Sequence, residues 1–185
     1  MTSGADLGHI RSEALAFRLE IADFGAFYAQ TYDLAYRTAM GIVRDPALAA
    51  DVTQDAYLAA YRQRDHFRGD APSRAWLHRI VVNQALAALR RRRPTGQVTE
   101  LALASTPDHA AGTTSQLALL AALDALPDRH RAAVVLRYYH DYDYATIAQI
   151  LETSSTNVGA MLSRALDRLK IALDTGPGAS DRTGR

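Results

Sequence analysis

The sequence predicts an all-α protein, and three of its features support that class. Alanine, the strongest helix former, occurs 35 times among 185 residues. Runs of β-branched residues are few and Gly-centred hairpin signals are nearly absent, which disfavours sheets. Prolines stand mostly between segments with helical periodicity and so punctuate a series of helices. The length allows one domain or two small ones, and the composition, 48% hydrophobic and 22% charged, is that of a folded protein.

Two helices are expected at the start of the periodic region. Residues 23–44 place apolar side chains at spacings of three, four and seven, as in an amphipathic helix. Asp45-Pro46 then restarts a helix, because Asp is a good N-cap and Pro fits the first helical position. This second helix extends to about Gln63 and turns Leu48, Val52, Ala56 and Ala59 to one side.

A third helix follows a loop. Residues 65–72 contain Gly69 and Pro72, and Ser73 can cap the helix after them. In that helix Trp76, Leu77, Ile80, Val81 and Gln84 are expected to face inward. The opposite stripe is expected to hold Arg79, Asn83, Leu86 and Arg90.

Beyond the arginine run 90–93 the chain changes character. Residues 95–116 are rich in Thr, Ser, Ala and Gly and are expected to form a flexible linker. Helices are expected from near Leu117 to the break at Pro127, then over 128–140, 143–151 and 156–173, and the last pair suits a helix-turn-helix. The predicted parts are an N-terminal extension (1–19), a first domain (20–94), a linker (95–116), a second domain (117–173) and a disordered tail (174–185).

Charge is unevenly distributed although the net charge is only +1. Residues 19–61 hold two arginines against six carboxylates, a net −4, whereas residues 62–93 hold nine arginines against two aspartates, a net +7. An acidic block followed by a basic block indicates two surfaces with different partners, and the basic one suits phosphates.

Several classes of function are disfavoured by the sequence. Because there is no cysteine, disulfides, thiolate zinc sites and cysteine nucleophiles are excluded. The six histidines never stand three or four apart on one helix, which disfavours a helix-borne metal pair. The longest uncharged stretch near the linker is too short and polar to span a bilayer, so no membrane insertion and a cytoplasmic location are expected. A small helical hydrolase lacks a convincing nucleophile, and no cofactor is expected.

Three stretches of the sequence form a recognisable pattern. They are Asp51-Val52-Thr53-Gln54-Asp55-Ala56-Tyr57, then Phe67-Arg68-Gly69-Asp70 through Trp76-Leu77-His78-Arg79-Ile80-Val81-Val82-Asn83, and Ala125-Leu126-Pro127-Asp128-Arg129-His130-Arg131 running into Ile147-Ala148. In their order and spacing, and with the charge reversal between them, they make the chain resemble a bacterial extracytoplasmic-function (ECF) sigma factor. Together with their connecting helices the stretches cover about 20–94 and 117–173.

The resemblance implies a non-enzymatic subunit of RNA polymerase built from two helical domains. The first domain would grip the polymerase clamp and open the minus-ten promoter element. The second domain would read the minus-thirty-five element beside the polymerase flap. The resemblance also implies a possible anti-sigma protein that holds the factor inactive.

An exposed stripe of the second helix is the expected polymerase-binding surface. It offers two carboxylates, an amide and an apolar side chain within two turns, which suits an arginine-rich partner helix. From periodicity alone a solvated helix face is the favoured interpretation, because charged helix faces are common, and only the resemblance shifts the balance to clamp binding. The residues are Asp51, Gln54, Asp55 and Leu58.

The basic segment is the expected site of minus-ten recognition and melting. Arginines there can contact phosphates without reading sequence, whereas Phe67 and Asn83 can hold an unstacked base by stacking and by edge hydrogen bonds. The alternative is structural: Phe67 plugs the bundle and Asn83 caps a backbone group. The expected residues are Phe67, Arg68, Gly69, Asp70, Arg74, Arg79, Asn83, Arg90, Arg91, Arg92 and Arg93.

The second domain departs from the family pattern in its recognition helix. Gly159-Ala160-Met161 stands where a basic and hydroxyl-bearing trio is usual, Glu152 replaces the usual turn Gly, and in the first domain Ala87 stands where Asp is common. Weaker minus-thirty-five binding is expected, because each lost phosphate contact removes part of the counterion release. The expected DNA-binding residues are Ser155, Thr156, Asn157, Arg164 and Arg168.

The four tyrosines at 138, 139, 142 and 144 are expected to pack the domain or bind a protein groove. Taken together, the predicted function is a promoter-specificity subunit that binds core RNA polymerase and promoter DNA. The alternative is a polymerase-independent helix-turn-helix regulator whose N-terminal half senses a signal or dimerises. Such a regulator would bind duplex operator alone, with half-site symmetry.

Overall fold

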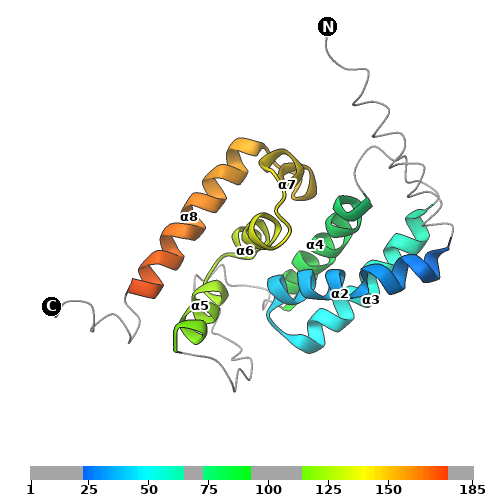
Figure 1. Cartoon of the computed structure of the whole chain (residues 1–185), viewed down its shortest axis with the longest axis horizontal. Helices are drawn as coiled ribbons and strands as arrows, with labels where there is room; N and C mark the ends of the chain where they lie inside the picture. Colours follow the sequence, from blue (N-terminus) through cyan, green and yellow to red (C-terminus); the bar gives the residue numbers. More distant parts are fainter. Residues whose placement is uncertain (1–22, 65–72, 93–113, 175–185) are drawn as a thin grey trace, which may run out of the picture.

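The computed structural model describes residues 23–64, 73–92 and 114–174, and every regular element within these ranges is helical (Figure 1). The all-α prediction is therefore confirmed. The elements are α2 (Phe24–Val43), α3 (Pro46–Gln63), α4 (Ser73–Arg92), α5 (Thr114–Asp124), α6 (Asp128–Val134), a π-helical turn η2 (Val135–Tyr139), α7 (Tyr144–Ile150) and α8 (Ser155–Asp174).

The break between α2 and α3 follows the sequence signals. Arg44 ends α2 with a left-handed backbone (φ 60°), and its N–H donates to the Met40 carbonyl at 3.0 Å. Asp45 then caps α3 by accepting from the Leu48 N–H at 2.9 Å, and Pro46 occupies the first helical position. The predicted restart of the helix at Asp45-Pro46 is thus confirmed, because the residue types supply both caps that the break requires.

The helices α2, α3 and α4 pack against one another around a core rich in alanine. Small side chains let helix backbones approach closely, and larger residues fill the ends of the bundle. The fully buried alanines of the three helices are Ala35, Ala39, Ala49, Ala56, Ala60 and Ala85.

Helix α4 is buried on two sides rather than one. Trp76, Ile80 and Val81 pack into the bundle as predicted, but Leu86, expected on the outward stripe, is also buried. The reason is that α4 also contacts α6 and α7 of the second group of helices. A central helix with two covered faces has no simple amphipathic pattern.

The second group of helices, α5 to α8, contains the expected helix-turn-helix in α7 and α8. The turn after α7 has the double hydrogen-bond pattern of a Schellman motif: the Thr153 N–H donates to the Ala148 carbonyl at 2.9 Å and the Glu152 N–H to the Gln149 carbonyl at 3.4 Å. Glu152 occupies the left-handed position of this motif with φ 51°, which glycine normally takes at lower conformational cost.

The two groups of helices lie against each other, with α6 and η2 beside α2 and with α7 beside α4 (Figure 1). Arg131 of α6 is the central polar residue of this contact and is only 5% exposed. Its guanidinium donates to the Ile42 carbonyl at the end of α2 at 2.6 Å and to the Asp128 carboxylate at 3.1 Å. It also donates to two carbonyls in the last turn of α5 and to the Leu126 carbonyl just after it. One buried cation thus caps the C-termini of two helices from different domains.

Some predicted boundaries differ from the structure or lie outside it. Helix α5 begins at Thr114, so the predicted linker 95–116 is too long at its C-terminal end. The extension 1–19, the loop 65–72, most of the linker and the tail beyond Asp174 lie outside the described residues. Among the helices described, none is long and apolar enough to cross a membrane.

Candidate polymerase and nucleic-acid interfaces

An aromatic cluster fixes α3 against α2 and so presents the outer face of α3. Tyr57 is the centre of the cluster: its ring lies 4.7 Å from that of Tyr28 and 6.3 Å from those of Phe24, Phe27 and Tyr32. Its hydroxyl lies 2.8 Å from Thr31 Oγ1, and burial raises the pKa of Tyr57 to about 12. The phenol is therefore a neutral structural group at physiological pH.

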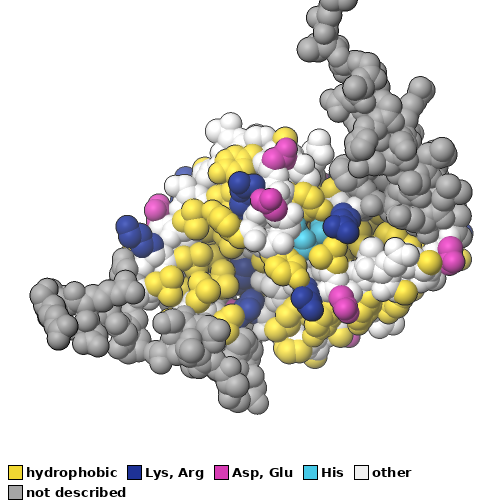
Figure 2. Space-filling view, viewed as in Figure 1, with side chains coloured by type: hydrophobic (Ala, Val, Ile, Leu, Met, Phe, Trp, Pro, Cys, Tyr) yellow, Lys and Arg dark blue, Asp and Glu magenta, His cyan; other side chains and the backbone are white. Residues whose placement is uncertain are grey.

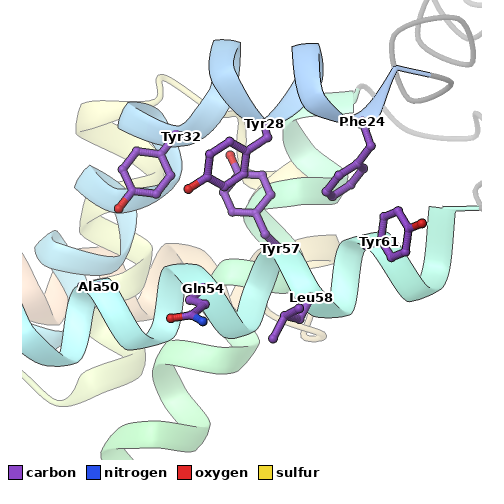
Figure 3. Close-up of a pocket in the computed structure, with 8 residues that line it drawn as sticks. All are labelled: Phe24, Tyr28, Tyr32, Ala50, Gln54, Tyr57, Leu58 and Tyr61. Carbon is purple, nitrogen blue, oxygen red and sulfur yellow. The ribbon is translucent and has the colours of Figure 1, made fainter.

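The predicted polymerase-binding residues Asp51, Gln54, Asp55 and Leu58 are all exposed on the outer face of α3. Figure 3 shows that Gln54 and Leu58 border a groove between α2 and α3, into which the aromatic side chains of both helices project. The groove has a volume of about 380 Å³. Two carboxylates therefore stand beside an apolar groove, a surface that suits a partner helix with arginines and apolar side chains.

Arg79 and Asn83 are exposed on α4, one turn apart, as predicted. They line a polar pocket of about 350 Å³ together with Trp76 and, from the second domain, Glu152. The Arg79 guanidinium donates to the Glu152 carboxylate at 2.9 Å. Hydrogen bonding and the charge of Arg79, with a smaller contribution from Asn83, lower the pKa of Glu152. In this arrangement a carboxylate of the helix-turn-helix turn contacts the predicted DNA-reading stripe.

The arginine run at the end of α4 is divided between two environments. Arg90 and Arg91 are exposed, as is Arg74 at the start of the helix, and their positions suit phosphate contacts. Arg92 instead donates to the Asp45 carboxylate at 2.7 Å, which ties the end of α4 to the cap of α3. The predicted residues Phe67, Arg68, Gly69, Asp70 and Arg93 lie outside the described residues.

The first turn of α8 exposes Ser155, Thr156 and Asn157. The preceding residue caps the helix, because the Ser154 hydroxyl accepts from the Asn157 N–H at 3.1 Å. Asn157 is also engaged by its side chain, which donates to Thr153 Oγ1 at 2.8 Å. The helix therefore starts with a free hydroxyl-bearing edge of the kind that contacts DNA in helix-turn-helix proteins.

Farther along α8, Arg164 and Arg168 are exposed on the side that faces α6. Burial, and then the charges of these two arginines, lower the pKa of His130 on α6. Of the trio 159–161, which departs from the family pattern, Met161 is only 5% exposed and packs in the core. On the surface of α8, the departure from the family pattern is therefore at Gly159 and Ala160, which are half-buried.

The tyrosines at 138, 139, 142 and 144 separate into two groups. Tyr142 packs in the contact between the domains, whereas Tyr138, Tyr139 and Tyr144 are exposed. Of the two expected roles, packing therefore applies to Tyr142, and binding of a protein groove stays a prediction for the other three. Tyr144 lies beside the recognition helix: a Cβ added at Gly159 would lie 3.5 Å from its ring. The Tyr144 ring therefore covers α8 at Gly159, where the helix has no side chain of its own.

The sequence analysis did not predict which residues form the contact between the domains. These residues are Thr38, His78, Arg131, His140 and Glu152. Such a contact leaves no periodic pattern, because each helix contributes only one or two residues to it. The one available signal was Glu152, which stands where the family has glycine.

Taken together, the fold and these surfaces define a class: a helical nucleic-acid-binding protein with a C-terminal helix-turn-helix and an N-terminal bundle that presents separate acidic and basic faces. The family model "Sigma-70 region 2" matches residues 27–95, and "Sigma-70, region 4" matches residues 116–169. Both matches follow the order of the two domains. The first match includes α4 and the acidic stripe of α3, which consists of Asp51, Gln54, Asp55 and Leu58. The second match includes the helix-turn-helix.

Two curated relatives are similar to this chain over most of their own length. The ECF RNA polymerase sigma factor SigM of Mycobacterium tuberculosis is 34% identical over 167 residues, which cover 87% of this chain and 84% of the relative. The RNA polymerase sigma-H factor of Pseudomonas aeruginosa is 33% identical over 146 residues, which cover 71% and 76%. The chain therefore belongs to the ECF sigma factors of RNA polymerase. As a class, sigma factors are promoter-recognising initiation factors.

Two solved structures share the fold across both domains. The sigma factor RpoE in complex with the anti-sigma factor NepR from Bartonella quintana has a TM-score of 0.66 at 22% identity, covering 83% of this chain and 98% of that one. CnrH in complex with the cytosolic domain of CnrY has a TM-score of 0.64 at 25% identity, covering 89% and 96%.

Proposed function

We propose that this sigma factor binds the clamp of core RNA polymerase through α3, recognises and opens the minus-ten element through α4 and the loop before it, and reads the minus-thirty-five element through α8. The observation that carries the proposal is that one chain holds both sigma-70 regions, with exposed carboxylates on α3, exposed arginines on α4 and exposed polar residues at the start of α8. The protein contributes recognition and strand opening, and the chemistry of RNA synthesis belongs to the polymerase.

The assignment of α3 to the clamp is supported by charge and shape. Asp51 and Asp55 are one turn apart and exposed, and Leu58 adds an apolar contact beside the aromatic groove. Nothing in the packing of α3 requires these two carboxylates, because the buried side of the helix is formed by other residues. Exposed charged residues that the fold does not need are available for a partner of opposite charge.

The assignment of α4 to the minus-ten element rests on Arg79 and Asn83. An amide can form paired hydrogen bonds with the edge of an unstacked base, and a guanidinium can bind the adjacent phosphate. Because both side chains lie on a rigid helix, their spacing is fixed before DNA binds. Phe67 completes the proposed site by stacking, as bases do on aromatic side chains.

Removal of either base contact should therefore affect strand opening more than initial binding. We expect Phe67→Ala or Asn83→Ala to lower open-complex formation about tenfold, since a flipped base is available only after melting and base stacking contributes about 1–3 kcal/mol. Permanganate footprinting of the promoter bubble measures this. Gln30→Ala, at an exposed position of α2, is the control. Normal opening by both variants would assign Phe67 and Asn83 to purely structural roles.

The recognition helix provides a second prediction, because Gly159 and Ala160 offer no cation. We expect scrambling of the minus-thirty-five element to reduce transcription only modestly, while changes in the minus-ten element nearly eliminate it. Gly159→Lys should strengthen promoter binding by holoenzyme and steepen its salt dependence by roughly one phosphate contact. Gly159→Ala is the matched control, since it gives the same relief of helix propensity without charge. Equal salt slopes for the two variants would place residue 159 away from the DNA.

Regulation and location follow from the same proposal. Both similar solved structures are complexes of sigma factors with anti-sigma partners. We infer that an anti-sigma protein can bind this chain in the same way and that the factor acts in the cytoplasm beside the polymerase.

The alternative of a polymerase-independent regulator is not favoured, because the N-terminal half matches sigma-70 region 2 rather than a separate sensor. The distinguishing experiment is a mobility shift of a promoter fragment with the protein alone, with core polymerase alone, and with both. We expect a specific complex only when both are present. A specific complex formed by the protein alone on a symmetric site would overturn the proposal.

A further inference from the structure

Two histidines from different domains face each other in the contact between the domains. His78 of α4 and His140, which follows η2, have ring centroids 4.0 Å apart. Each imidazole has one hydrogen bond across the contact: His78 Nδ1 lies 2.8 Å from the Tyr142 hydroxyl, and His140 Nε2 lies 2.9 Å from Thr38 Oγ1. Figure 2 shows histidine atoms at the boundary between the two groups of helices.

The hydrogen bonds show that this arrangement suits neutral rings. The Thr38 hydroxyl donates to the Leu34 carbonyl at 2.7 Å, so it must accept from His140 Nε2–H. His78 is 1% exposed, and its Nε2 has no hydrogen-bond partner among the described residues. A protonated His78 would need acceptors for two N–H groups, and the Tyr142 hydroxyl supplies only one. A second proton would therefore leave a buried N–H group unsatisfied, which is costly.

The surrounding charges also oppose protonation. Arg74, one turn before His78 on α4, is the cation whose charge affects both rings. Arg37 of α2 interacts with Tyr139, and Arg137 of η2 pairs with Asp141 at 3.6 Å. Asp141 is 97% exposed at its side chain and so provides little compensation inside the contact.

We propose that the His78–His140 pair is a pH-dependent latch between the two domains of this sigma factor: neutral rings hold the domains together, and protonation of both rings separates them. Burial is the main cause that lowers the pKa of His78 to about 3 and that of His140 to about 4, with Arg74 contributing to both. When the domains separate, the pKa of each imidazole returns to the ordinary value of 6.5.

The direction of the pH effect follows from these values. The closed form binds fewer protons than the open form below pH 6.5, so closure weakens as the pH falls through 6.5 and continues to weaken towards pH 4. Two such groups change the ratio of open to closed molecules about 100-fold between pH 7.5 and 5.5. At neutral pH the latch contributes its full stabilisation.

Separation of the domains would also free Arg79 and Asn83 of α4, the residues proposed to read DNA, from their contact with Glu152. Glu152 contacts Arg79 only because α7 lies beside α4, so separation of the domains removes this carboxylate from the pocket that contains Asn83. This consequence rests on the proposed function of α4, whereas the latch itself does not. Acidification would thus make the minus-ten surface accessible without any change in the acidic stripe of α3, which is exposed in the closed form.

Single-molecule energy transfer on the full-length chain tests the latch without polymerase or DNA. Because the chain has no native cysteine, Ala47→Cys and Ser163→Cys place one dye on each domain at exposed positions. We expect the ratio of open to closed molecules to rise about 100-fold from pH 7.5 to 5.5. His78→Asn and His140→Gln, which retain a polar atom near Nδ1 and Nε2 respectively, should each reduce the rise to about tenfold, and together should abolish it.

His130→Gln is the matched control, since His130 is a partly buried histidine of α6 for which no contact with the pair is found among the described residues, and it should retain the full rise. An unchanged ratio in the unmutated chain, or the same rise in the double variant, would overturn the proposal. If circular dichroism shows that a variant does not fold, an NMR pH titration of the histidine signals of the unmutated chain is decisive. Titration midpoints well below pH 6.5 for His78 and His140 support the latch, and midpoints near 6.5 contradict it.

Discussion

Replacement of Asp51 and Asp55 together by arginine should abolish co-purification of this sigma factor with core RNA polymerase. Two attractive contacts with a basic partner helix become repulsive ones, and individual close charge pairs at protein interfaces couple by about 1.5–7 kcal/mol. A loss of at least about 100-fold in affinity is expected. Because both carboxylates are exposed on α3, the helix content should remain unchanged.

The design includes a matched single variant. Asp33 of α2 is an exposed carboxylate of the same domain that lies outside the stripe, so Asp33→Arg makes the same charge change elsewhere. We expect Asp51→Arg to weaken the complex strongly and Asp33→Arg to leave it nearly intact. Equal effects would indicate a general charge effect, and co-purification of the double variant at normal levels would remove the clamp assignment from α3.

Arg131→Met should produce the largest loss of stability among single substitutions. The guanidinium makes five hydrogen bonds while almost fully buried, and three of its acceptors are carbonyls in the last turn of α5 or just after it. Methionine fills much of the volume but leaves these carbonyls and the Asp128 carboxylate without their donor. Removal of one partner of a buried ion pair typically costs about 3–5 kcal/mol, or roughly 10 °C in melting temperature for a chain of this size.

Calorimetry and energy transfer separate the two consequences of this substitution. Because Arg131 also donates to the Ile42 carbonyl of α2, the variant should separate the domains as well as melt earlier. Arg91→Met, at an exposed position of α4, is the control and should change the melting temperature little. A melting temperature within about 2 °C of the unmutated chain would contradict the capping role of Arg131.

Local signals in the sequence predicted the helices well, since those signals act over a few residues. Asp45-Pro46 specifies both a cap and a first helical residue, and α3 begins there. The stripe on α3 was predictable because one side of that helix is buried and the other is exposed. Leu86 was wrongly placed because α4 packs on two sides, and the second side is covered by α6 and α7, which lie more than 40 residues further along the chain.

The site residues were predictable where the resemblance supplied their motif. They were not predictable where tertiary contacts determine whether a side chain is exposed or buried. Arg79, Asn83 and Arg164 are exposed as expected, but Met161 packs in the core, which periodicity in a short segment did not resolve. Glu152 was recognised as a departure from the family. Its contact with Arg79 depends on the packing of two domains and has no counterpart in local sequence.

The most direct test of the central claim is run-off transcription from a promoter library randomised in both elements, with purified core polymerase and this protein. We expect transcripts that start from a defined subset of promoters, enriched in one minus-ten sequence and less strictly in one minus-thirty-five sequence. The Asp51→Arg/Asp55→Arg variant should yield no more transcript than core polymerase alone. Promoter-independent transcription at the level of the core enzyme, with no enriched sequence, would contradict the account.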